Sequence, residues 1–277
     1  MVVAIIAIMA TIVMGALNIA RESAREARTK ATIMKIHDVI MQKYDAFLTR
    51  RVPVDTTGMA PRVAAQVRLK AIRYLMMMEM PDRAADINTA AATAAPIDLG
   101  VGGAKLPWSS LAVLYGQKLA AQQPKANMLP AKCLYMIVTM GSPEAREMFS
   151  DSEIADVDGD GWPVFIDAWG NPIMFLRWAP AFTLEAGLSD IQTNNADTSH
   201  DPFDPMNTEQ GAYKLIPLIY SPGRDRHYCI DVKGNFSYQQ NPSPYASGAG
   251  APGAETPGDG KTNMYYDNIH NHHIEAR

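Results

Sequence analysis

The chain opens with a run of apolar residues, "VVAIIAIMATIVMGALNIA" at positions 2–20, whose only polar side chains are Thr11 and Asn18. A helix of this length rises ~30 Å, which matches the hydrocarbon core of a bilayer. A cleaved secretory signal needs a basic segment before a shorter apolar stretch, and neither feature is present. We therefore expect residues 1–20 to form a retained membrane or filament segment, with a buried core helix as the alternative.

The helical pattern continues beyond this run. The stretch "RESAREARTKATIMKIHDVIMQKYDAFLTRR" has no Gly or Pro, and its apolar residues recur every three or four positions, at Ile33, Ile36, Ile40, Tyr44 and Phe47. This spacing is typical of an amphipathic helix that packs on one face. We expect one helix over residues 1–52, apolar all round in its first half and packed against a globular head along its second. An anchor followed by a separate surface helix is the alternative.

The pattern after Pro53 changes from helical to strand-like. Helices are predicted at "RVAAQVRLKAIRYLMMMEM", "SSLAVLYGQKLAAQQ" and "AKCLYMIVTM", followed by an antiparallel meander at "PVFIDAWGNPIMFLRW" and "KLIPLIYSPGRDRHYCI". Residues 240–261 are rich in Gly, Pro and Ala, which is typical of a mobile loop. We predict an α+β fold with a globular head over residues 53–239 and a low-complexity loop and tail over residues 240–277.

Three segments resemble type IV pilins and the pseudopilins of type II secretion. The apolar start running into "RESAREARTKAT" resembles their N-terminal helix, and "DAWGNPI" at 167–173 resembles the D-x-W-G-N-P segment of major pseudopilins. "YSPGRD" at 220–225 resembles the S-x-G-x-D-G turn, with Arg226 in place of its second glycine. Family members carry a basic leader, then a phenylalanine and a glutamate, which are absent here. We therefore expect the first residue to be an internal methionine of a longer chain.

The resemblance implies a structural role and no enzymatic activity. Such a subunit rests in the bacterial inner membrane by its N-terminal helix, with the head in the periplasm or outside the cell. An inner-membrane assembly platform then packs it with copies of itself and other pilin-like subunits into a filament. Small residues in the apolar run allow close helix approach: Ala4, Ala7, Ala10, Gly15 and Ala16. Two alternatives remain: a single-span calcium-dependent binding protein that does not polymerise, and a membrane-tethered metal-dependent hydrolase.

The segment "DVDGDGWPVFID" carries the clearest local signal for a ligand. Aspartates at its first, third, fifth and twelfth positions and glycine at its sixth match the spacing of an EF-hand calcium loop, except for Asp in place of the final Glu. The resemblance adds to this, because pseudopilins commonly stabilise their C-terminal loops with calcium. A solvated acidic turn without an ion is the alternative. The predicted Ca²⁺ ligands are Asp156, Asp158, Asp160, Trp162 through its carbonyl oxygen, and Asp167.

Charge and composition exclude several function classes. A net charge of −4 and the absence of a nucleic-acid-binding motif argue against a nucleic-acid partner. No G-x-S-x-G, H-E-x-x-H or phosphate-binding glycine loop is present, so no catalytic residue is predicted. Cys133 and Cys229 lack CxxC spacing, and a disulfide between them stays open for an exported head. The C-terminal residues Asp267, His270, His272 and His273 are a weak candidate for a zinc site, because their spacing fits no ligand motif.

Overall fold

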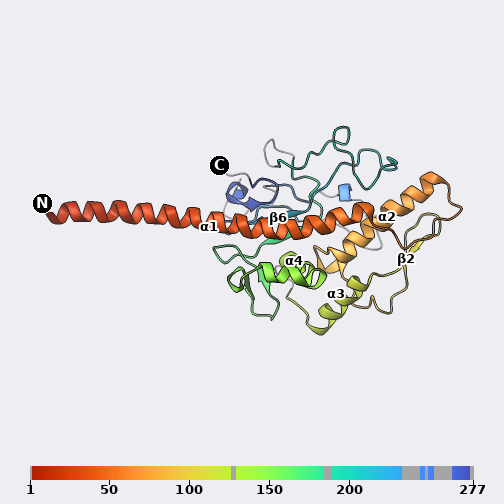
Figure 1. Cartoon of the computed structure of the whole chain (residues 1–277), viewed down its shortest axis with the longest axis horizontal. Coiled ribbons are helices and arrows are strands. Elements are labelled where there is room, and N and C mark those ends of the chain that lie inside the picture. The colour runs from red at the N-terminus through yellow and green to blue at the C-terminus, as the bar shows by residue number, and fades with distance from the viewer. Residues whose placement is uncertain are drawn as a thin grey trace.

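The computed structural model describes residues 2–125, 129–183, 189–232, 244–246, 249–252 and 264–274, with backbone only for residues 2–6, 8, 246, 264 and 265. It consists of helices packed with small antiparallel sheets, which confirms the predicted α+β class. A single helix extends from one end of a globular head, and the head holds all the other described elements (Figure 1).

The first helix, α1 (Val2–Thr49), is continuous, as predicted. Its first half projects from the head, and its second half lies along the head (Figure 1). Throughout the described side chains, no helical stretch is both long and apolar enough to cross a membrane. The predicted transmembrane segment 1–20 includes Met1 and the side chains of residues 2–6 and 8, which lie outside the described residues.

Three further helices build one side of the head. They are α2 (Pro61–Glu79), α3 (Ser110–Ala121) and α4 (Leu129–Gly141). Proline begins α2, where its missing N–H costs nothing, and the Ser109 hydroxyl accepts a hydrogen bond from the Ala112 N–H at 3.1 Å to cap α3. Short 3-10 turns follow at η1 (Ala84–Asp86), η2 (Pro143–Met148), η3 (Asp151–Glu153), η4 (Pro244–Ala246) and η5 (Met264–Asp267).

The strands are short and pair in three antiparallel sheets. β1 (Ile97–Asp98) pairs with β2 (Lys105–Leu106), and β3 (Ile154–Ala155) pairs with β4 (Val164–Phe165). The largest sheet has the order β5 (Met174–Leu176), β6 (Leu218–Ser221) and β7 (Ile269–His270). Its third strand comes from the segment expected to be a mobile tail, so residues 269–274 belong to the head.

The core lies between the second half of α1 and the other elements. The apolar stripe predicted on α1 is buried, and α1 contacts α2, α4, β6 and β7. Met76, Met77, Met78 and Met80 of the α2 region are buried in the same core. Their flexible side chains fill the irregular space between helices. The packing therefore fixes the direction in which the exposed half of α1 leaves the head.

Candidate functional site

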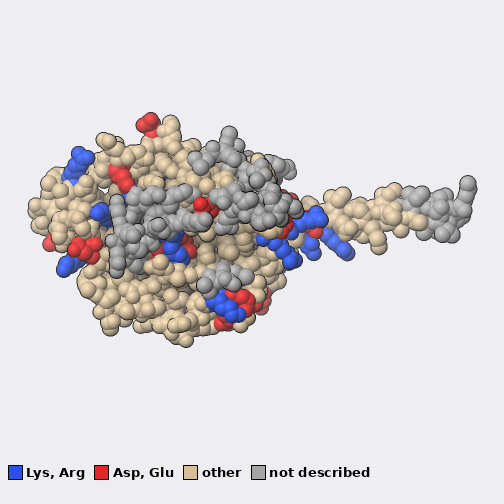
Figure 2. Space-filling view, turned by 180° about the vertical axis from the view of Figure 1, so that it is seen from behind, with Lys and Arg blue, Asp and Glu red and all other residues tan. Residues whose placement is uncertain are grey.

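The exposed half of α1 is the most unusual surface of the molecule. We call residues 9–20 the stalk. Six large apolar side chains along it are 50–74% exposed: Met9, Ile12, Val13, Met14, Leu17 and Ile19. Figure 2 shows that its described part carries no charged side chain until it reaches the head. Contiguous exposed apolar surface of this kind marks a site that another molecule covers.

A band of charged side chains follows the stalk, where α1 enters the head (Figure 2). Arg25 and Glu22 form an ion pair at 2.9 Å, and the Arg28 guanidinium donates to the Ser152 hydroxyl at 2.6 Å. The Trp169 indole N–H donates to the Glu22 carboxylate at 3.0 Å. That hydrogen bond is the main reason that the pKa of Glu22 is lowered. The base of the stalk is thus tied to the head by specific polar contacts.

A buried carboxylate holds the next turn of α1. Glu153, at the end of η3, accepts hydrogen bonds from the Thr32 hydroxyl at 2.6 Å, the Lys35 ammonium at 3.0 Å and the Ser150 N–H at 2.9 Å. Burial on its own raises the pKa of Glu153, but hydrogen bonds from Thr32, Ser150 and Lys35 outweigh it and hold that pKa at about 2. The charged carboxylate therefore clamps α1 to the head.

The two motifs that resemble pseudopilins meet in one place. We call Asp167, Trp169, Asn171, Ser221 and Gly223 the motif hub. The Asp167 carboxylate, in a side chain that is nearly fully buried, accepts from the backbone N–H groups of Trp169 and Asn171, both at 2.8 Å. It also accepts from the Asn171 amide at 3.0 Å and the Ser221 hydroxyl at 2.7 Å. The Asn171 amide donates further to the Gly223 carbonyl at 3.0 Å, which joins the two turns.

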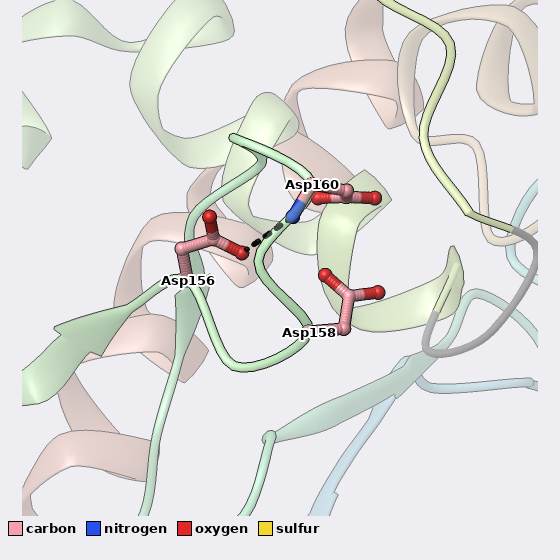
Figure 3. A group of neighbouring side chains, drawn as sticks. All are labelled: Asp156, Asp158 and Asp160. Carbon is pink, nitrogen blue, oxygen red and sulfur yellow. Dashed lines mark hydrogen bonds between the residues drawn. The ribbon is translucent and has the colours of Figure 1, made fainter.

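The predicted acidic loop lies in a separate place, between β3 and β4. Asp156, Asp158 and Asp160 come together, with one carboxylate oxygen of each within 4.8 Å of the others (Figure 3). The Asp156 carboxylate accepts the backbone N–H groups of Gly159 at 2.9 Å and of Gly161 at 2.8 Å. Gly161 has a φ of +83°, as the sharp turn of such a loop requires. The three aspartates of the predicted set therefore lie on one tight turn.

A lysine from α4 lies among these carboxylates. The Lys132 ammonium donates to Asp158 at 2.7 Å and to Asp160 at 2.5 Å, and the side chain is only 1% exposed. Burial on its own lowers the pKa of Lys132, but hydrogen bonds to Asp158 and Asp160 outweigh it and raise that pKa. The pKa of Asp160 is held well below its usual range, because these hydrogen bonds outweigh the effect of burial.

The five predicted calcium ligands are not brought together. Asp167, the twelfth residue of the loop, belongs to the motif hub, where both of its oxygens already accept hydrogen bonds. Trp162 is buried, with its backbone N–H donating to Asp160 and its indole N–H to the Gln122 carbonyl, both at 2.9 Å. Within the loop, Lys132 already places one positive charge against two of the three carboxylates. Lys132 lies 24 residues before the loop, so no local spacing could have revealed it.

The C-terminal histidines are structural in this arrangement. His270 and His272 are buried, and His273 lies 2.6 Å from the Asp190 carboxylate. The His272 Nε2 lies 3.2 Å from the Pro217 carbonyl, which can only accept, so the Ser189 hydroxyl donates to Nδ1 at 2.9 Å. Across the described ranges, the three aspartates of the acidic loop are the only cluster of metal-ligating side chains.

The remaining candidate residues are also accounted for. Asp267 accepts a hydrogen bond from the Asp225 N–H at 3.2 Å. Cys133 and Cys229 are both buried thiols, and the disulfide that the sequence left open is not formed. No known protein family, no curated protein and no solved structure matches this chain.

Proposed function

We propose that this chain is a structural subunit of a pilus-like filament of the type II secretion pseudopilus class, and not an enzyme. The observation that carries this proposal is the stalk: a helix that leaves the head with six large apolar side chains exposed. Burial of each such side chain is worth about 1.5–3 kcal/mol. A chain that leaves six of them exposed gains stability when copies of the stalk cover one another.

The small residues of the stalk support helix packing as the mode of assembly. Gly15 has open space around the position that a Cβ would take, and Ala10 and Ala16 lie on the same helix. Small side chains let neighbouring helix backbones approach closely. We propose that the apolar end of α1 rests in the inner membrane before assembly, with the head in the periplasm, and then packs against copies and other pilin-like subunits.

The contacts at the base of the stalk give the filament a fixed geometry. Trp169 of the motif hub binds Glu22, and the Ala168 N–H donates to the Thr29 hydroxyl at 3.1 Å. These contacts join α1 to the loops that resemble the pseudopilin motifs. A subunit whose head keeps one orientation on its helix adds to a regular filament, whereas a freely hinged head does not.

Site-specific photo-crosslinking tests this proposal in the full chain. A photoreactive phenylalanine derivative is placed at Met14 of the stalk, which is 69% exposed, and in a matched control at Met206 of the head, which is 58% exposed. Irradiation of the protein in the envelope of an expressing bacterium is expected to give a ladder of multimers from position 14. Mass spectrometry of the ladder should identify stalk peptides of a second copy, and position 206 should give no such ladder.

A non-polymerising membrane-anchored protein behaves differently in this experiment. Position 14 then crosslinks to lipid or to one unrelated protein, and no multimers appear. The substitution Val13→Asp provides a second measurement, because it places a charge on the stalk without touching the head. The multimer ladder should disappear in this variant while the thermal unfolding of the head stays unchanged. Multimers that persist with Val13→Asp would contradict assembly through the stalk.

A further inference from the structure

Each carboxylate of the acidic loop has at least one hydrogen-bond donor from within the chain. An ammonium group has three N–H donors, and those of Lys132 are directed to Asp158 at 2.7 Å, Asp160 at 2.5 Å and the Lys125 carbonyl at 3.4 Å. The Asp156 carboxylate is satisfied by backbone N–H groups of the same turn. Each carboxylate of the loop therefore has a donor from within the chain.

A second lysine supports the same arrangement. The Lys125 N–H donates to Asp160 at 2.7 Å, and its ammonium donates to the Asp158 carbonyl at 2.6 Å. Two positive charges thus lie against three negative ones, and the backbone dipoles around Asp156 offset part of the remainder. In an EF-hand loop, a divalent cation supplies this compensation.

We infer that the Lys132 ammonium is the resident cation of this loop and takes the place that calcium takes in other loops of the same spacing. The loop then keeps its shape at any calcium concentration. Removal of the ammonium leaves Asp158 and Asp160 facing each other, and the second oxygen of Asp158 already has no hydrogen-bond partner. Two like charges held this close favour a divalent ion between them. The inference concerns the loop alone and holds whether or not the chain polymerises.

The substitution Lys132→Met tests the inference, because methionine keeps most of the length of the side chain and removes its charge. The readout is hydrogen–deuterium exchange of the amides of residues 159–162, which donate to Asp156 and Asp160. In the unaltered chain, these amides should exchange at the same rate in EDTA and in 5 mM CaCl₂, a concentration above the weak extracellular range of about 10⁻⁴ to 10⁻³ M. In Lys132→Met, exchange in EDTA should be about tenfold faster, and calcium should restore protection.

Two further variants make the result specific. Lys132→Arg keeps the positive charge, so its loop should stay insensitive to calcium. Lys43→Met removes a half-buried lysine whose ammonium binds the Gly141 carbonyl, and it should also leave the loop unchanged. Circular dichroism confirms that each variant is folded; if Lys132→Met does not fold, Lys132→Gln replaces it.

Either of two results overturns the inference. The first is an unaltered chain whose loop amides exchange faster in EDTA than in calcium, because the loop then depends on a bound ion despite Lys132. The second is a folded Lys132→Met or Lys132→Gln variant whose loop exchanges as slowly in EDTA as the unaltered loop, because Lys132 then contributes nothing to the shape of the loop. A calcium-dependent recovery of protection in the variant alone supports it.

Discussion

Acidification from pH 7 to pH 5 should destabilise the head through the buried histidines of the C-terminal segment. His270 lies in β7, and His272 follows it, 1% exposed. Phe182 packs edge-on against both rings, at centroid distances of 4.8 and 5.0 Å. Burial is the main cause that lowers the pKa of His272 to about 4 and the pKa of His270 to about 3. Both rings are therefore uncharged in the folded head at neutral pH.

The sign and size of the effect follow from these values. In the unfolded chain, both rings take up a proton below their ordinary pKa of 6.5, whereas in the folded head they do so only near pH 4 or 3. The unfolded state thus binds more protons between these values, and stability falls as the pH drops. At pH 5, each ring lowers the free energy of unfolding by about 2 kcal/mol relative to neutral pH. That corresponds to about 4–8 °C in Tm for each ring.

The measurement is a urea titration of the full chain at several pH values from 7.5 to 4.5. The substitution His272→Gln replaces the ring with a group that does not titrate, so the free energy of unfolding should lose about 2 kcal/mol less over this range than in the unaltered chain. His227→Gln, outside this layer, serves as the control. Other groups cancel in the comparison, including Asp86, whose pKa burial raises to about 6 and which acts in the opposite direction.

An equal pH dependence in the unaltered chain and in His272→Gln would refute the reasoning, because the buried ring would then contribute nothing to the acid response. Hydrogen exchange adds a local check. The Asn271 N–H donates to the Ile219 carbonyl at 3.1 Å, next to β7. The protection of the Asn271 amide should weaken at pH 5 before the protection of the α4 amides does. The reason is that protonation of His272 releases the C-terminal segment before the rest of the head unfolds.

Two further predictions concern the motif hub. Asp167→Asn should lower the free energy of unfolding by about 3 kcal/mol, because its N–H₂ group would face N–H and O–H donors whose hydrogen bonds the carboxylate now accepts. Urea titration measures this loss. The control Asp151→Asn, on the fully exposed surface, should show no change. Gly223→Ala should destabilise more than Gly170→Ala. Both glycines have positive φ, but only at Gly223 would a Cβ lie 2.5 Å from the Asp267 carbonyl oxygen, so equal losses in Tm would contradict the packing described.

The sequence predicted the helices well because their signals are local. Continuous helix formers and a spacing of three or four residues specify α1 without reference to the rest of the chain. The sheets were predicted less well. Strands of two to four residues are too short for alternation to identify them. The pairing of β7 with β6 joins residues about 50 positions apart, and histidines in a polar segment give no sign of it.

In the candidate site too, local features were predictable and long-range contacts were not. The convergence of Asp156, Asp158 and Asp160 was predictable, because a turn with glycine at its sixth position forms within a few residues. The roles of Lys132 and Asp167 could not be predicted from the sequence. Lys132 reaches the loop from α4, and Asp167 is drawn into the motif hub by Ser221, 54 residues away. Spacing alone cannot distinguish a carboxylate that faces a loop from one that faces a neighbouring turn.

The first half of α1 departs from the usual pattern of a helix in a globular protein. Its large apolar side chains are exposed on the stalk, whereas Thr29 and Thr32, where the helix enters the head, are completely buried. The Thr29 hydroxyl donates to the Arg25 carbonyl at 3.0 Å, and the Thr32 hydroxyl donates to the Glu153 carboxylate at 2.6 Å. The stalk has no comparable cover within the described chain, and because exposed apolar surface is unfavourable in water, it is the part of the molecule that a partner would complete.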